Sequence, residues 1–250
     1  GPDSSQHQVF QAVGLPMADA TLRGQNTCLF AYGQSGAGKT FSMNGATPNF
    51  KYRGIIPRAI NQIFVETGRH YDQDFTISVS YLEIYNEQMV DLFSADTVAP
   101  PTKPQMGSSG SRDLFGSSIG GGSFDRPERR VSRLQIKEDS ERGVYVSGLK
   151  EEIVTSPTQV LELLRTGVAR RHVGETNMNV ESSRSHTIFR MVVESRAVGE
   201  NASGAANGAQ DAVLVATLNL VDLAGSERVV KTGAEGIRMK EGANINKSLL

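Results

Sequence analysis

The chain has 250 residues, of which 38% are hydrophobic and 21% charged, and its formal net charge is −1 at pH 7. This length fits one large α/β domain, or two small ones, with a sizeable buried core. A near-neutral chain has no overall basic field for nucleic acid, and no apolar run approaches the about 18 residues of a membrane span, so neither partner is expected. The single cysteine, Cys28, excludes a disulfide within the chain and predicts a small core side chain in a reducing, intracellular compartment.

Apolar spacing at Val9, Val13 and Met17 predicts a helix over residues 6–22, with Pro16 disturbing its middle. The apolar run from Cys28 to Tyr32 is too short for a free helix and predicts a buried strand.

A glycine-rich loop follows this strand. It reads Gly33-Gln34-Ser35-Gly36-Ala37-Gly38-Lys39-Thr40, which matches the phosphate-binding P-loop pattern G-x-x-x-x-G-K-[ST]. The glycines let several backbone N–H groups point at one anion, and a helix that starts near Lys39 would add the positive end of its dipole. We expect the Lys39 ammonium to reach the outer phosphates of a nucleotide and the Thr40 hydroxyl to ligate Mg²⁺.

The middle of the chain predicts a helix at Pro57–Glu66 and a strand at 75–82 with two unlike faces. Residues 94–130 are dominated by Pro, Gly and Ser. Such a segment cannot bury enough apolar surface to offset its ordering entropy. We therefore expect a mostly disordered surface insertion there, rather than a domain boundary.

Further elements follow the insertion. A strand pair is predicted at Leu134–Lys137 and Val144–Val146, then a helix at 156–171 with Ser156 as N-cap and Gln159 completing a capping box. A strand at 187–195 and a low-complexity loop at 197–210 come next. The strand at 213–221 is almost entirely apolar, which predicts a central strand covered on both faces.

Two further stretches carry chemistry. The last strand ends in Asp222-Leu-Ala-Gly225-Ser-Glu227, and an acid at the carboxyl end of a strand beside a P-loop strand suits a Mg²⁺-bound water. Gly225 can bring its N–H close to a γ-phosphate, because it has no side chain. The second stretch, Asn179-Val-Glu-Ser182-Ser183-Arg184-Ser-His186, offers hydroxyls and a guanidinium for phosphate, metal or water.

These three stretches resemble the P-loop, switch one (N-x-x-S-S-R-S-H) and switch two (D-L-A-G-S-E) of the kinesin motor domain. Residues 81–86 (Y-L-E-I-Y-N) and 244–249 (N-I-N-K-S-L) are also similar to kinesin stretches, in the family's order. The run 172–196 is most similar to the centromere-protein-E-like kinesins. The resemblance implies an α/β P-loop NTPase core with a central mixed sheet and helices on both faces.

The resemblance also implies ATP and ADP as ligands, Mg²⁺ as cofactor and a role for each site residue. Lys39 and the backbone of 33–40 would hold the phosphates, Thr40 and Ser183 would ligate Mg²⁺, and Asp222 would hold it through water. Asn179 and Ser182 would place the γ-phosphate and the attacking water, and Gly225 would sense the γ-phosphate. Arg184 and Glu227 would form the ion pair that closes the site. His186 could be a general base, but we favour a structural role.

By the same resemblance the partner is the microtubule, with tubulin contacts from Arg142, Lys240 and Lys247, and the location is the cytoplasm and cytoskeleton, with the spindle and kinetochore as further candidates. Residues 1–250 would be part of a motor domain, whose remaining strands, helices and neck linker lie before residue 1 and after Leu250. Dimerisation would involve those other regions. The function expected is microtubule-stimulated ATP hydrolysis that drives movement along microtubules.

The alternatives are a GTPase, a myosin and a binding module. Asn246-Lys247 resembles the start of the guanine-reading N-K-x-D, but Leu249 stands where the Asp belongs. A myosin has an aromatic residue where this chain has Ser226. A module that binds nucleotide and microtubules, without independent motor activity in this truncated form, remains the second interpretation.

Overall fold

The computed structural model describes residues 3–46, 50–85, 87–94, 134–140, 143–173, 184–198 and 213–227. Several predicted features lie outside these residues. They are the insertion at 94–130 beyond Ser94, most of the loop at 197–210, the site residues Asn179, Ser182 and Ser183, and the track-contact candidates Arg142, Lys240 and Lys247.

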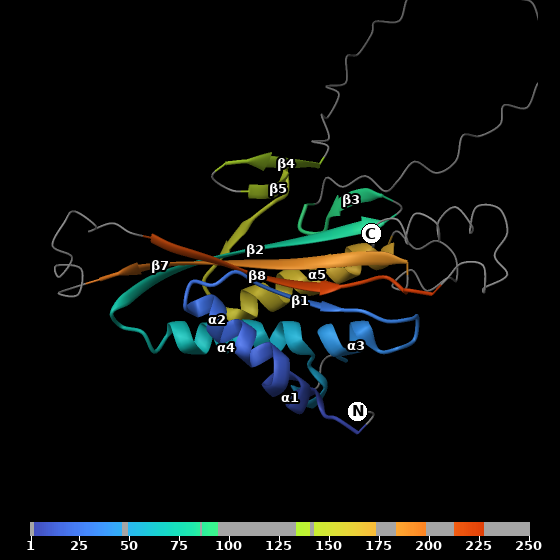
Figure 1. Ribbon diagram of the computed structural model, residues 1–250, viewed down its shortest axis with the longest axis horizontal. Coiled ribbons are helices and arrows are strands. Elements are labelled where there is room, and N and C mark those ends of the chain that lie inside the picture. The colour runs from blue at the N-terminus through green and yellow to red at the C-terminus, as the bar shows by residue number, and fades with distance from the viewer. Residues whose placement is uncertain are drawn as a thin grey trace, which may run out of the picture.

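The described elements include both helices and strands, with most of the helices in the first third of the chain (Figure 1). In order they are α1 (Gln6–Val9), η1 (Phe10–Gly14), α2 (Leu15–Leu22), β1 (Thr27–Ala31), α3 (Lys39–Met43), η2 (Phe50–Tyr52), α4 (Ile55–Thr67), β2 (Gln73–Tyr85), β3 (Gln88–Asp91), β4 (Gln135–Asp139), β5 (Gly143–Ser147), β6 (Glu152–Val154), α5 (Pro157–Val173), β7 (Ser185–Ala197) and β8 (Val213–Asp222). The predicted elements that fall on described residues are present, and η2, β3 and β6 are additions to them.

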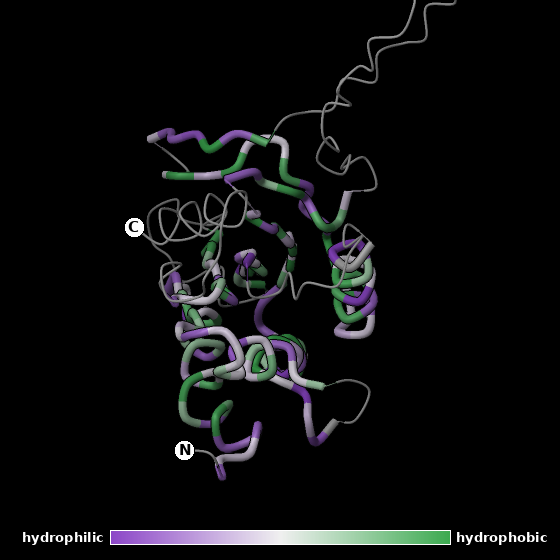
Figure 2. The backbone as a smooth tube through the Cα atoms, turned by 90° about the vertical axis from the view of Figure 1, so that its right-hand side faces the viewer, coloured by the Kyte–Doolittle hydropathy of each residue, from purple (hydrophilic) through white to green (hydrophobic). Residues whose placement is uncertain are grey.

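The main sheet has the strand order β1-β8-β7-β2-β3, with β6 pairing β2. β1 and β8 run parallel, whereas β7 is antiparallel to both β8 and β2. The sheet is therefore mixed, as predicted for an α/β P-loop core. β4 and β5 form a separate two-stranded sheet, which lies above the main sheet in Figures 1 and 2, whereas the N-terminal helices lie below it.

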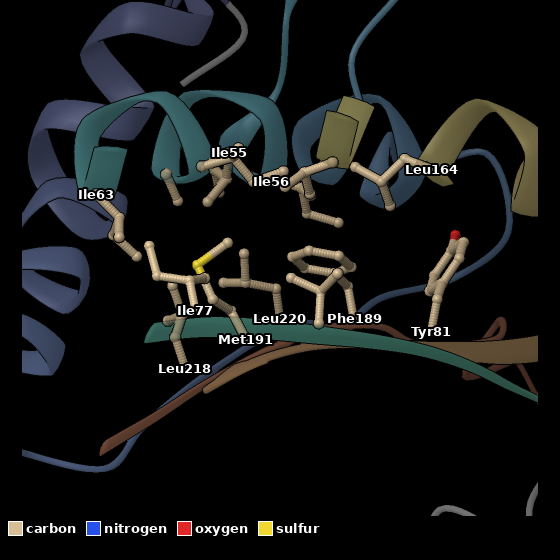
Figure 3. Close-up of a cluster of buried hydrophobic side chains, with 14 of the residues drawn as sticks. Ile55, Ile56, Ile63, Ile77, Tyr81, Leu164, Phe189, Met191, Leu218 and Leu220 are labelled. Carbon is tan, nitrogen blue, oxygen red and sulfur yellow. The ribbon is translucent and has the colours of Figure 1, made fainter. Parts of the chain in front are cut away.

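The hydrophobic core lies between the main sheet and the helices below it (Figure 3). Its fully buried side chains come from α4 and α5 on one side and from three strands on the other, and include Ile56, Ile60, Ile63, Val160, Tyr81, Phe189, Met191, Leu218 and Leu220. The described helices cover this one face. The helices predicted for the other face do not fall on described residues.

The first strand is less buried than predicted. Cys28 is exposed, and Phe30 and Tyr32 expose 62% and 66% of their surface. Burial alternates along β1 because only one face meets the core. The prediction of a buried strand with a core cysteine is therefore wrong.

Covering on both faces is also wrong for the start of β8. Val213, Leu214 and Val215 are exposed, and from Ala216 onward every second residue is buried. An apolar run shows that a strand can be covered, but the packing of other elements decides which faces are.

The predicted disturbance in the N-terminal helix is a π-helical segment, η1, between α1 and α2. It ends at Gly14, two residues before Pro16. Proline lacks an N–H and its ring crowds the carbonyl four residues earlier, so a local widening of the helix relieves this conflict. None of the helices in the described residues is both long and apolar enough to cross a membrane.

Helix α5 begins as predicted, with Ser156 accepting a hydrogen bond from the Gln159 N–H at 3.3 Å. The Gln159 side chain accepts from the Thr155 N–H at 3.0 Å, instead of from Ser156 as a capping box requires.

The buried Asp91 carboxylate, at the end of β3, accepts hydrogen bonds from the N–H groups of Phe93, Ser94 and Lys150. Asp91 thus ties the chain before residue 95 to the segment that follows β5.

Candidate functional site

The glycine-rich loop joins the end of β1 to the start of α3. Gly36 and Gly38 have φ angles of 76° and 87°, which favour glycine over any residue with a side chain. Gly38 is also the N-terminal cap of α3, so the helix begins at Lys39. The strand, loop and helix predicted from the P-loop pattern are therefore present in that order.

The parallel pairing of β1 with β8 brings the second predicted stretch to this loop. Ala31 at the end of β1 is the register partner of Asp222 at the end of β8. The carboxyl ends of parallel strands meet at one edge of a sheet, which is where ligands bind in open α/β folds. Residues 222–227 therefore lie beside the loop, although nearly 200 residues separate them in the sequence.

Lys39 and Thr40 are both engaged within the site. The Lys39 ammonium is buried and donates to the carbonyl oxygens of Gly33 at 2.9 Å and Gln34 at 3.0 Å. The Thr40 hydroxyl donates to Asp222 Oδ2 at 2.6 Å. A cation and a hydroxyl are thus held at the loop where the pattern predicts phosphate and Mg²⁺.

Asp222 has one oxygen left over. Its side chain is 2% exposed, and within the described part of the chain Oδ1 is buried with no hydrogen-bond partner. Burial raises the pKa of Asp222, while the Thr40 hydrogen bond and the charges of Arg171 and Lys39 act in the opposite direction. An unpaired buried oxygen is costly, and beside a threonine hydroxyl it fits the oxygen ligands that Mg²⁺ prefers. The residues present therefore fit this metal.

The segment after Asp222 is bonded to the loop at two more points. The Ser226 N–H donates to the Gly33 carbonyl at 3.1 Å. Glu227 Oε2 accepts from the Ser35 N–H at 2.9 Å, and its Oε1 accepts from the Ser35 hydroxyl. A Cβ atom on Gly225 would collide with both Glu227 and Ser35. Glycine at 225 therefore permits this close approach.

Glu227 remains a carboxylate in this environment. Burial raises its pKa, but the hydrogen bonds from Ser35 and the charge of Lys39 outweigh that effect and hold the pKa of Glu227 below its usual value. The Ser35 contact was not predicted from the sequence, since 192 positions separate the two residues. The predicted ion pair between Arg184 and Glu227 stays a prediction.

Strand β7 begins beside the same segment. Its first residues follow Arg184, and Thr187 is the register partner of Asp222. The buried His186 accepts a hydrogen bond at Nδ1 from the Ala224 N–H at 3.0 Å. This contact fixes the backbone between Asp222 and Glu227, which supports the structural role favoured for His186.

The His186 contact predicts a pH dependence of stability. The ring must be neutral at Nδ1 to accept this bond, and burial lowers the pKa of His186 below its usual value. The unfolded chain therefore binds a proton more readily than the folded one, so this stability is complete above about pH 6.5 and is lost as the pH falls below it. We expect the midpoint of thermal unfolding to drop between pH 7 and pH 5.5, and to drop less in His186→Asn.

The control for this experiment is His70→Asn, since His70 is a half-exposed histidine just after the C-terminal end of α4. It should keep the pH dependence of the wild type. An equal drop in His186→Asn and in the wild type would contradict the role of the Ala224 contact.

The sequence model of the kinesin motor domain matches residues 1–250. The chain belongs to the kinesin motor domain family. It is 46% identical over 251 residues to kinesin-like protein KIN-7I of Oryza sativa subsp. japonica, a match that covers 100% of this chain and 17% of that protein. It is 41% identical to human centromere-associated protein E, over 96% of this chain and 7% of that protein.

A solved structure of a fast kinesin is also similar, with a TM-score of 0.73, 35% identity, and coverage of 97% of this chain and 57% of that one. The resemblance to kinesins and the α/β P-loop core are thereby confirmed. The chain spans about a sixth of the length of the rice relative. What the complete protein does is therefore a matter for proposal.

Of the predicted kinesin site, the described residues bring together the loop 33–40, Asp222, Gly225 and Glu227, with Arg184 next to β7. Three contacts of this region were not predicted from the sequence. They are the bonds of Ser35 to Glu227, of the Ala224 N–H to His186, and of Arg171 to Glu83 and Ser185. No local pattern marks such contacts, because each joins distant parts of the chain.

Proposed function

We propose that this protein hydrolyses ATP with Mg²⁺ and couples the reaction to movement along microtubules. One observation carries the proposal. The Thr40 hydroxyl bonds Asp222 at 2.6 Å, next to a buried lysine and a glycine-rich loop, and Asp222 keeps a second buried oxygen without a partner. This arrangement suits a nucleotide whose phosphates lie on the loop and whose metal lies at Thr40 and Asp222.

The loop 33–40 and the proposed metal ligands would bind the nucleotide together. Lys39 would move its ammonium from the loop carbonyls to the outer phosphates, and the N–H groups of 33–40 would surround them. Thr40, Ser183 and, through water, Asp222 would hold Mg²⁺. When bound, the metal would neutralise charge on the phosphates.

The remaining residues would act in hydrolysis by positioning. Asn179 and Ser182 would orient the γ-phosphate and the water, and Gly225 would donate its N–H to the γ-phosphate. Arg184 and Glu227 would pair when the site closes. Phosphoryl transfer depends mainly on placement and charge, so this set needs no strong base. Loss of the γ-phosphate would release both switch segments.

The test is steady-state turnover by the full-length protein. We expect ATP hydrolysis that requires Mg²⁺, that rises when microtubules are added, and that exceeds GTP hydrolysis. Equal or faster GTP turnover would overturn the nucleotide assignment. Nucleotide and microtubule binding without turnover would favour the second candidate, a binding module without independent motor activity.

The partner and the domain follow from the same proposal. Residues 1–250 would form part of a motor domain, with 94–130 as an insertion on its surface. The partner would be the microtubule, and the location the cytoskeleton in the cytoplasm. The fast kinesin is described in terms of its ATPase mechanism and its interactions with microtubules, which supports both assignments.

Track contact gives a prediction for three basic residues, Arg142, Lys240 and Lys247. In the sequence Arg142 falls between β4 and β5, and these two strands lie on the side of the main sheet away from the N-terminal helices (Figure 1). A protein of net charge −1 needs local cations to bind an acidic filament. We expect Arg142→Glu and Lys247→Glu to raise the microtubule concentration for half-maximal ATPase by about 3- to 10-fold, more at low salt.

Turnover without microtubules should barely change in these variants. Arg126→Glu, within the insertion, is the matched charge reversal and should have little effect on either quantity. If Arg126→Glu were as damaging as the other two, the insertion would become the better candidate for track contact.

A further inference from the structure

A buried ion pair close to the proposed nucleotide site has no role in the scheme above. Arg171 in the last turn of α5 donates through Nε to Glu83 Oε1 of β2 at 2.9 Å. Their side chains are only 6% and 11% exposed. Removing two charges from water costs several kcal/mol per ion, so such a pair adds little net stability, although losing one partner is costly. We therefore expect the main effect of this ion pair to be on the positions of the groups that it holds.

The same guanidinium also holds the start of β7. Arg171 Nη2 donates to the Ser185 hydroxyl at 2.7 Å. Arginine presents its donors in a rigid planar fork, so one side chain fixes the relative positions of both acceptors. Arg171 therefore ties α5, β2 and β7 at one point, and Ser185 is the immediate neighbour of Arg184.

Glu83 of the ion pair lies in the same row of the sheet as Asp222 of the proposed metal site. Glu83 pairs in register with Thr187, and Thr187 pairs with Asp222. Residues opposite one another in a sheet share a face, so the three side chains form one row across β2, β7 and β8. All three are buried. The preceding row on this face, Tyr81, Phe189 and Leu220, points into the apolar core (Figure 3). The polar layer thus closes the core on the side of the loop 33–40.

The neighbouring residue Arg170 provides a comparison. It lies in the same turn of α5 and donates one bond to the Leu92 carbonyl at 2.9 Å. That bond ties α5 to the chain after β3, and does not reach β7. The two adjacent arginines therefore allow the effect of anchoring the helix end to be separated from the effect of holding Ser185.

We propose that Arg171 is a positioning residue for ATP hydrolysis, which holds Ser185 and Glu83 so that Arg184 keeps its place relative to Asp222. The inference rests on the proposed function and extends it to a residue outside the nucleotide contacts. Arg171 does not touch the substrate. It acts through Ser185, at the head of the strand whose next residues pair with the end of β8.

The test uses two variants that break the Arg171–Ser185 bond differently. Ser185→Ala removes the acceptor and keeps the Arg171–Glu83 pair. Arg171→Lys keeps the charge and can still pair with Glu83, but lacks the fork that reaches both acceptors. In the full-length protein we expect kcat for ATP to fall about 10- to 100-fold in both, because small misplacements of reacting groups are costly. KM for ATP should change less than about 3-fold, since the loop contacts remain.

Three controls separate positioning from folding. Ser185→Thr keeps the hydroxyl and should restore kcat to within about 3-fold of the wild type. Arg170→Ala removes the Leu92 contact and should leave kcat close to that of the wild type. The thermal unfolding midpoint is recorded for all variants, and should stay above the assay temperature by more than about 10 °C.

The outcomes are distinct. No ATP turnover by the wild type would refute the proposed function itself. Wild-type turnover with an unchanged kcat in Ser185→Ala would overturn the role of Arg171. An equal loss in Arg170→Ala, a failure of Ser185→Thr to restore kcat, or a loss of kcat only in variants that unfold at the assay temperature would show that the contact is merely structural.

Discussion

Replacing Lys39 with alanine is expected to weaken nucleotide binding by about 100-fold or more. The Lys39 ammonium is buried at the loop and makes two hydrogen bonds to loop carbonyls. In the proposed complex the ammonium bonds the phosphates instead of these carbonyls. Hydrogen bonds to charged groups contribute about 1.5–3 kcal/mol each, and about 1.4 kcal/mol corresponds to a tenfold change in affinity. Titration with a fluorescent ADP analogue measures the loss directly.

Lys39→Met tests whether the charge or the packing matters, because methionine keeps most of the buried volume. It should bind nucleotide as poorly as Lys39→Ala. The control is Lys150→Ala, which removes a half-exposed lysine paired with Glu152. It should bind nucleotide like the wild type. Near-normal binding by Lys39→Met would contradict the assignment of Lys39 to the phosphates.

Replacing Glu227 with alanine is expected to abolish hydrolysis and to spare binding. We expect kcat for ATP to fall at least about 100-fold, because the proposed closure with Arg184 cannot form. The dissociation constant for ATP should change less than about 3-fold, since among the described residues the hydrogen bonds of Glu227 to the loop go to Ser35. Rapid-quench measurement of a single turnover separates the chemical step from nucleotide binding.

Glu66→Ala is the matched control, since Glu66 is a partly buried glutamate that binds Arg69 away from the loop. It should leave both constants near those of the wild type. Normal turnover by Glu227→Ala would remove Glu227 from the mechanism. A large loss of nucleotide affinity would show instead that its bonds to Ser35 hold the loop in its binding conformation.

The sequence by itself determined the local parts of the site. The glycines at 36 and 38 fix a backbone conformation that other residues rarely adopt, so the loop and the start of α3 could be predicted from spacing alone. The periodicity of α4 and the alternation in β2 likewise predicted those elements, since each depends on residues close in sequence. The order of the three motifs also sufficed for the resemblance to kinesins.

Other features were decided only by the tertiary structure. Thr40 meets Asp222, and Ser35 meets Glu227, across separations of 182 and 192 positions. The parallel pairing of β1 with β8 creates these contacts. The sequence of neither strand predicts which strand it pairs with. Arg171 could be predicted as a helix-end cation, but not as the partner of Glu83 and Ser185.

The exposed face of β1 also shows that burial could not be predicted from the sequence. Cys28 and Phe30 lie in an apolar run, yet both are exposed. Residue type and spacing set the preferences of the backbone over a few positions, because those preferences come from local sterics and hydrogen bonding. The packing of all the elements together decides which faces are covered and which distant side chains meet. The free energy of that packing depends on the whole chain, so no single segment predicts it.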